Sequence, residues 1–289
     1  MHKKLICLVL FLCLFAGGCA AADGLTVTAT FYPIYLAAIN VCRGVEGISV
    51  TCLAPPTAGC LHDYQITSME RRTLADSDVI LANGAGLESF LEKLLPQLKG
   101  TVIEAAEGIE LLPGHEDEWN PHVWVSVSGA IREAENIAAG LAAADPAHAD
   151  EYAANCAAYT AKLLELKEET AAALAPCAGK SIVTFHEAFD YYAAEFDLTV
   201  AAVVQHEEGD APSAREIVET VQIIRKKDVC ALFAEPQYTD ESIDLIARET
   251  GLPVYLLDPV VSGEADPDDT DAYLRIMRQN LSTLLEALE

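Results

Sequence analysis

The longest uninterrupted helical pattern in the chain covers residues 145–176, DPAHADEYAANCAAYTAKLLELKEETAAALAP. Asp145 and Pro146 are typical of a helix start, and Pro176 marks the next stop. Between them, side chains that recur every three or four residues predict one buried face: Tyr159, Leu163, Leu166, Thr170 and Leu174. At about 1.5 Å per residue, a helix over 146–175 is roughly 45 Å long. We therefore expect it to join two separate parts of the molecule.

Short apolar strands alternate with helices on both sides of this long helix. Before it we expect strands at 25–30, 48–53, 78–82 and 101–103, and helices at 33–41, 67–75, 86–98 and 128–144. After it we expect strands at 180–185, 198–204, 229–234 and 252–257, and helices at 186–196, 212–227, 239–250 and 271–288. Repeated strand-then-helix order is typical of an open parallel sheet. The pattern predicts an α/β fold of two lobes, each a mostly parallel sheet flanked by helices.

The first 19 residues read MHKKLICLVLFLCLFAGGC and have the features of an export signal. Two lysines precede an apolar run over 5–16, which is shorter than the roughly 20 residues of a membrane span. The small residues directly before Cys19 resemble a bacterial lipobox, which predicts a lipid on Cys19; ordinary secretion is the alternative. The expected division of the chain is a signal peptide at 1–18, an N-terminal lobe at 19–144, the linking helix at 145–176 and a C-terminal lobe at 177–289.

The composition excludes several classes of function. The chain has 289 residues, 52% of them hydrophobic, and 45 acidic against 18 basic side chains give a formal net charge of -27. Nucleic-acid binding and docking on anionic lipid both depend on basic side chains, so we expect neither. The acidity is typical of a soluble exported surface, although part of it could attract a cation.

Three side chains that bind metals follow predicted strands. His186 comes directly after the strand at 180–185, Asp258 directly after the strand at 252–257, and His62 lies in the loop that leaves the strand at 48–53. In open α/β sheets, ligands bind beyond the carboxyl ends of the strands. His122 lies near the junction with the linking helix. Three imidazoles and one carboxylate suit Zn²⁺ well, and Mn²⁺ less selectively.

Six stretches around these residues resemble the zinc- and manganese-binding solute receptors of bacterial ABC transporters. They are Phe31-Tyr-Pro-Ile-Tyr35, His62-Asp-Tyr64, Asn120-Pro-His-Val-Trp124, Phe185-His-Glu-Ala-Phe189, Glu235-Pro-Gln237 and Leu257-Asp-Pro259. Their order is that of the family, over nearly the whole mature chain. The resemblance implies metal ligation by His62, His122, His186 and Asp258, and two lobes around one rigid linking helix.

The resemblance also implies a function. It predicts a receptor that is anchored by lipidated Cys19 to the outer face of the cell membrane, binds Zn²⁺ between its lobes and delivers it to an ABC permease. We expect a monomer. Manganese members commonly have Glu where this chain has His186, so zinc is favoured and manganese is the alternative. The family's long His- and acid-rich loop is reduced here to residues 114–118, and Asn120 replaces the more usual Asp.

Other roles remain open beside this one. Glu235 ends the strand at 229–234 and could orient a ligand histidine, or be only an acid at a helix start. A zinc-dependent hydrolase would need an open coordination position and a base, for which Glu187 or Glu235 is conceivable. No H-E-x-x-H or G-x-S-x-G motif is present, so we expect no enzyme activity. A surface adhesin could use the same fold.

The cysteines predict one disulfide. Six remain besides Cys19 once the signal is removed: Cys42, Cys52, Cys60, Cys156, Cys177 and Cys230. Cys52 and Cys60 enclose seven residues, and Pro55, Pro56 and Gly59 allow the chain to turn back between them. A Cys52–Cys60 bridge would restrict the loop that carries His62; two reduced thiols are the alternative.

Overall fold

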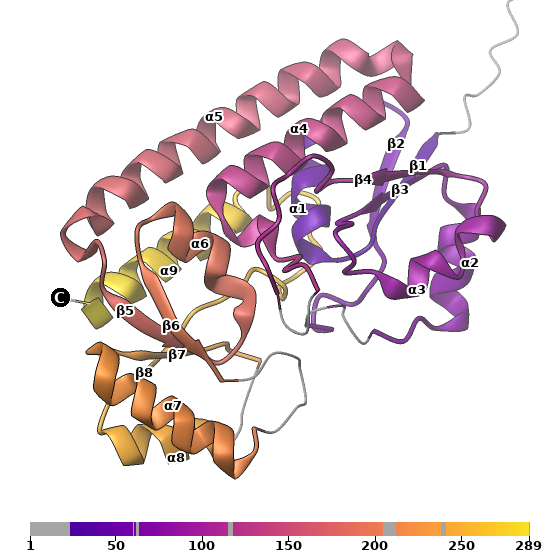
Figure 1. Ribbon diagram of the computed structural model, residues 1–289. Coiled ribbons are helices and arrows are strands. Elements are labelled where there is room, and N and C mark those ends of the chain that lie inside the picture. The colour runs from indigo at the N-terminus through magenta and orange to yellow at the C-terminus, as the bar shows by residue number, and fades with distance from the viewer. Residues whose placement is uncertain are drawn as a thin grey trace, which may run out of the picture.

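The protein has two parallel sheets with the same strand order, one in each lobe (Figure 1). The computed structural model describes residues 24–59, 61, 64–114, 118–204, 212–237 and 241–288. The first sheet has the order β2-β1-β3-β4 and the second the order β6-β5-β7-β8, with every pairing parallel. The strands are β1 (Leu25–Ala29), β2 (Ile48–Cys52), β3 (Val79–Ala82), β4 (Thr101–Glu104), β5 (Ser181–Thr184), β6 (Thr199–Val203), β7 (Leu232–Ala234) and β8 (Val254–Leu256). The predicted two-lobed α/β fold is confirmed.

The helices also follow the predicted pattern, with one exception. They are α1 (Tyr32–Val41), α2 (Ser68–Asp76), α3 (Ser89–Glu92), α4 (Val127–Ala144), α5 (Ala149–Leu174), α6 (Asp190–Glu195), α7 (Ala214–Lys227), α8 (Glu241–Thr250) and α9 (Ala272–Leu288). The helix expected over 86–98 is only the short α3 and a separate 3-10 turn, Leu95–Gln97. Pro96 has no N–H and its ring clashes with the preceding turn, so a continuous helix cannot pass through it.

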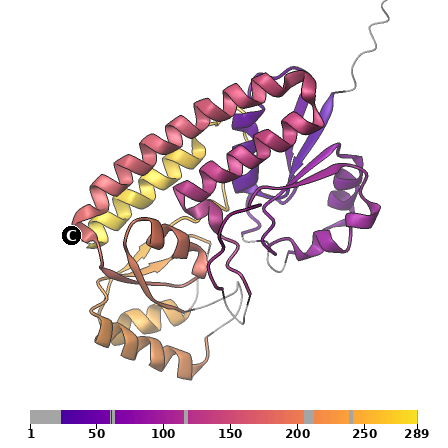
Figure 2. The same ribbon diagram turned by 45° about the horizontal axis from the view of Figure 1, so that its top comes forward.

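Helix α5 is the predicted linking helix. Its 26 residues span about 39 Å at 1.5 Å per residue, and a 3-10 turn extends each end. The five residues of the predicted stripe are buried, and Tyr152 and Cys156 continue it toward the start of the helix. Helices α4 and α9 pack beside α5, so the three form a layer that runs along both lobes (Figure 2).

This helical layer gives the two lobes a common core. One continuous apolar cluster contains Val27 of β1, Leu163 of α5, Leu281 of α9 and Phe233 of β7. A second cluster lies under α7 and α8 in the C-terminal lobe. The lobes are therefore joined by packed side chains as well as by the chain itself. The boundaries at 144 and 176 stay a prediction.

Two carboxyl groups are buried in this part of the molecule. Glu88 accepts hydrogen bonds from the Thr30 hydroxyl (2.7 Å) and from the backbone N–H groups of Asn83 (2.7 Å) and Gly84 (3.0 Å). Glu133 on α4 is 2% exposed, and its Oε1 has no hydrogen-bond partner in the described chain. Burial raises the pKa of Glu88 to about 7 and the pKa of Glu133 well above its usual value. The folded protein therefore holds protons that the unfolded chain releases.

Replacing Glu133 by Gln should stabilise the protein increasingly as the pH rises. Because the folded pKa lies above the unfolded value of about 4.5, Glu133 costs little stability below pH 4.5, and its cost grows at higher pH. We expect the difference in Tm between Glu133→Gln and the wild type to increase by several degrees from pH 5 to pH 8, at about 2–4 °C per kcal/mol.

Calorimetry at several pH values measures this difference. The control is Glu135→Gln, which removes an exposed acid two residues further along the same helix and should show no such trend. A Glu133→Gln difference that is constant from pH 5 to pH 8 would contradict a buried, protonated Glu133.

Candidate metal centre

Two of the predicted ligands form a pair of buried imidazoles. His186 follows β5 and precedes the 3-10 turn Glu187–Phe189, and His122 precedes the 3-10 turn Val123–Val125 that leads into α4. Their ring centroids are 4.7 Å apart at an interplanar angle of 90°. His122 is 0% exposed and His186 is 3% exposed. The structure thus brings together two histidines that are 64 positions apart in the sequence.

The Asn120 side chain determines the tautomer of His122. Asn120 Oδ1 accepts the His122 backbone N–H (3.0 Å) and lies 2.8 Å from His122 Nδ1. The orientation of the amide is fixed because its Nδ2 donates to the Glu187 carbonyl oxygen (3.0 Å). An amide oxygen only accepts, so His122 Nδ1 carries the proton. A neutral imidazole with one unprotonated nitrogen is the form that binds a metal.

Glu235 supports His186 in the corresponding way. Its Oε1 lies 2.8 Å from His186 Nδ1, and both side chains are 3% exposed. The second oxygen of Glu235 accepts a hydrogen bond from Gln237 Nε2 (2.6 Å). Histidines that bind metals are commonly held by a carboxylate at the other ring nitrogen. The contact between Glu235 and His186 therefore fits the expected orienting role, which stays a prediction.

Asp258 lies just beyond β8 and is held through its backbone. Asn280 on α9 accepts the Asp258 N–H at 2.9 Å and donates to the Asp258 carbonyl at 2.7 Å. Asp258 Oδ1 accepts the N–H of Val260, whose φ of 65° is unusual for a β-branched residue. Burial raises the pKa of the Asp258 carboxyl group, and the negative charge of Glu235 raises it further. Asp258 is therefore close enough to Glu235 for the two charges to interact.

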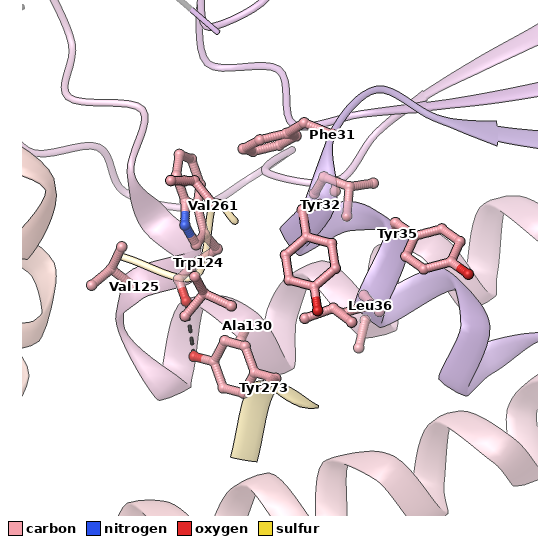
Figure 3. Packing of buried hydrophobic residues seen from close by; sticks show 14 of the residues in the cluster. Phe31, Tyr32, Tyr35, Leu36, Trp124, Val125, Ala130, Val261 and Tyr273 are labelled. Carbon is pink, nitrogen blue, oxygen red and sulfur yellow. Dashed lines mark hydrogen bonds between the residues drawn. The ribbon is translucent and has the colours of Figure 1, made fainter. Parts of the chain in front are cut away.

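Trp124 connects the His122 segment to the Asp258 segment. Its indole Nε1 donates to the Pro259 carbonyl at 2.7 Å, and its ring packs edge-on against Phe31 with centroids 4.9 Å apart. Figure 3 shows the hydroxyl of Tyr273, on α9, directed at the Trp124 backbone oxygen, to which it donates at 2.8 Å. The tryptophan is 1% exposed, and its ring centroid lies 5.2 Å from that of His122.

Several predictions fall on residues that the structure does not describe. His62 and Cys60 lie outside the described residues, as do the signal segment and Cys19. Cys52 is a free thiol here and its Sγ donates to the Ala54 carbonyl at 3.3 Å, so the Cys52–Cys60 bridge is not confirmed. Within the described ranges, no three His, Cys, Asp or Glu side chains are close enough to bind a metal ion. The four-ligand set stays a prediction.

Sequence reasoning missed the polar residues that support the imidazoles. It treated Asn120 as a departure from a pattern, and it assigned no role to Asp190, Tyr191 or Gln237. The Tyr191 hydroxyl donates to the Asn120 carbonyl at 2.7 Å, and Asn120 Nδ2 lies 3.3 Å from Asp190 Oδ2. The only sequence signal was proximity, because Asn120 lies two positions from His122 and Gln237 two positions from Glu235.

Two parallel-sheet lobes joined along a long helix, with buried histidines at their junction, define a solute-binding protein of the metal-binding class. The profile of ZnuA, described as "Zinc-uptake complex component A periplasmic", matches residues 27–287, and the chain belongs to this family. The family consists of receptors rather than enzymes. None of the helices in the described ranges is both long enough and apolar enough to cross a membrane.

Known relatives agree with this assignment. The chain is 28% identical to the zinc-binding lipoprotein AdcA of Streptococcus pneumoniae (strain ATCC BAA-255 / R6), over 99% of the chain but only 61% of AdcA. It is 26% identical to the high-affinity zinc uptake system protein ZnuA of Bacillus subtilis (strain 168), over 92% of the chain and 88% of that protein. The structure of the solute-binding protein FpvC of Pseudomonas aeruginosa with Mn²⁺ superposes with a TM-score of 0.82 at 28% identity, covering 91% of this chain and 98% of FpvC.

Replacing Trp124 by Phe should destabilise the protein. The smaller ring retains an aromatic contact with Phe31 but leaves the buried Pro259 carbonyl without its donor, which costs about 1–3 kcal/mol. Urea unfolding measures the loss. The matched control is Trp119→Phe, at a side chain that is 59% exposed, where we expect little change. Equal stability of Trp124→Phe and the wild type would show that the indole bond does not hold the two segments together.

Proposed function

We propose that this chain is an extracytoplasmic receptor that binds Zn²⁺ between its lobes and delivers it to an ABC permease. The observation that supports this most directly is the buried His122–His186 pair, in which each Nδ1 is held by a polar side chain. Histidines that bind a metal through one ring nitrogen commonly have this kind of support at the other. His62 and Asp258 are the proposed third and fourth ligands.

The proposed donor set favours a receptor over a hydrolase. Four protein ligands complete the tetrahedral coordination of Zn²⁺, so no position remains for an activated water. Three imidazoles also suit Zn²⁺ better than Mn²⁺, which prefers oxygen ligands. FpvC binds Mn²⁺ with a similar fold, so the fold alone does not determine the metal, and the donor atoms do. Manganese is the alternative cargo.

Anchoring and delivery are parts of the same proposal. The family is described as a component of a zinc-uptake complex, and AdcA is described as a lipoprotein. In this chain the small residues 16–18 precede Cys19, the proposed lipidation site. The receptor would then act as a monomer at the outer face of the membrane, held there by lipid alone.

Replacing any of the four proposed ligands by Ala should weaken zinc binding by at least tenfold. Each of His62→Ala, His122→Ala, His186→Ala and Asp258→Ala removes one of four donors from the proposed site. Competition with a zinc-chelating dye measures the Kd. The control is His148→Ala, since His148 pairs with Asp145 near the start of α5 and should not affect affinity. A variant that keeps wild-type affinity would remove its residue from the ligand set.

Replacing Cys19 by Ser should release the protein from the membrane. A Ser side chain offers no thiol for the lipid, so the exported protein is expected in the soluble fraction of a bacterial expression host, whereas the wild type is expected in the membrane fraction. Cell fractionation detects the release from the membrane, and intact-mass measurement detects the loss of the lipid. The control is Cys230→Ser, which removes a thiol far from the signal in the sequence. A wild-type mass without lipid would favour ordinary secretion.

A further inference from the structure

Asn120 is completely buried and uses each of its polar groups. Its side-chain oxygen binds His122, and its Nδ2 donates to the Glu187 carbonyl (3.0 Å) and toward Asp190 Oδ2 (3.3 Å). Its backbone N–H donates to the Leu112 carbonyl at 2.9 Å. With an exposed fraction of 0%, none of these bonds competes with bulk water. A buried amide in such a network is strongly fixed in orientation.

The partners of this amide belong to the two segments that carry the imidazoles. On one side is His122, in the segment that leads into α4; on the other are Glu187, next to His186, and Asp190, the first residue of α6. Tyr191 strengthens the same link, because its hydroxyl donates to the Asn120 carbonyl and accepts the Leu112 N–H at 2.8 Å. The distance between the imidazoles is thus set by contacts within the protein.

In this chain, the partners of position 120 require both an acceptor and a donor, which an amide supplies. It must accept from His122 and at the same time donate to Glu187 and Asp190. A carboxylate accepts only, so Asp at position 120 would leave the Glu187 carbonyl without its donor. It would also place a second negative charge about 3.3 Å from Asp190 Oδ2, where like charges repel.

We propose that Asn120 and Asp190 form a polar bridge that holds His122 and His186 as a preassembled pair, with the His122 proton on Nδ1, before zinc arrives. This inference rests on the proposed function and adds positioning residues to it. Zinc then binds to two imidazoles that are already ordered, so the ordering cost of the pair is not subtracted from the binding free energy. Supporting residues of this kind commonly change metal affinity by 10–100-fold.

The test combines zinc affinity with the tautomer of His122. Asn120→Asp should weaken zinc binding at least tenfold. Adding Asp190→Asn should restore much of the loss, because the new amide at 190 can donate to the carboxylate at 120. The matched control is Asn136→Asp on α4, where Nδ2 also donates to two carbonyls, those of Ala105 (2.7 Å) and Glu107 (2.9 Å), but contacts no imidazole. We expect this control to keep wild-type zinc affinity.

Long-range ¹H–¹⁵N spectra of the zinc-free protein report the tautomer directly. We expect His122 of the wild type to carry its proton on Nδ1, and Asn120→Ala to show a mixture of both tautomers, which a purely structural role would not produce. A wild-type His122 protonated on Nε2 would overturn the proposal. So would wild-type zinc affinity of Asn120→Asp, an equal loss in Asn136→Asp, or a double variant no better than Asn120→Asp.

The failure of the proposed function is a separate result. If the wild type binds no zinc, or if His122→Ala binds it as tightly as the wild type, the zinc site is wrong. The tautomer of His122 in the zinc-free protein still decides whether the amide bridge exists. If the wild type binds zinc through His122 and the bridge variants have no effect, only the bridge is wrong.

Discussion

Burial of one face of α5 is the constraint on which the rest of the molecule depends. Leu163, Leu166 and Leu174 are each no more than 1% exposed, because α4 and α9 cover them along the length of the helix. At about 25 cal/mol per Å² of apolar surface, burial along a 26-residue helix contributes more than any single hydrogen bond in the structure. The resulting core extends into both lobes. The sheets, and therefore the loops at their carboxyl ends, are placed relative to this layer.

Polar contacts then fix the segments of His122 and His186 more closely than the apolar layer does. The indole of Trp124 fixes the distance from the His122 segment to Pro259, and the amide of Asn120 fixes the distance to Glu187. Both donors are almost fully buried, where an unmade hydrogen bond is costly. The positions of the imidazoles are therefore determined by several short contacts from different elements rather than by one loop.

The sequence predicts the elements well because their signals are local. The stripe on α5 and the apolar strands follow from spacing alone, and Ser213 and Glu216 form the capping box that starts α7. The helix expected over 86–98 was wrong in its length, because Pro96 interrupts a helix. Positions beyond strand ends indicated His186 and Asp258 correctly as residues at one edge of the second sheet.

The sequence does not predict contacts between segments that are far apart in the chain. His122 follows no strand, so its place beside His186 depends on how α4 packs, which no local pattern encodes. The contact of Asn120 with Asp190 joins residues 70 positions apart, and an amide and a carboxylate are common on any surface. The contact is significant because Asn120 is shielded from water, and only the folded chain determines that burial.

The position of α9 in the chain has a consequence for biosynthesis. This helix leaves the ribosome after both sheets, yet its Asn280 holds the backbone of Asp258 and its Tyr273 supports Trp124. Until it emerges and docks, part of the apolar face of α5 has no cover. A nascent chain without α9 therefore exposes apolar surface to which chaperones and proteases can bind. The hydrogen bonds that α9 makes to Asp258 and Trp124 therefore form only late in synthesis.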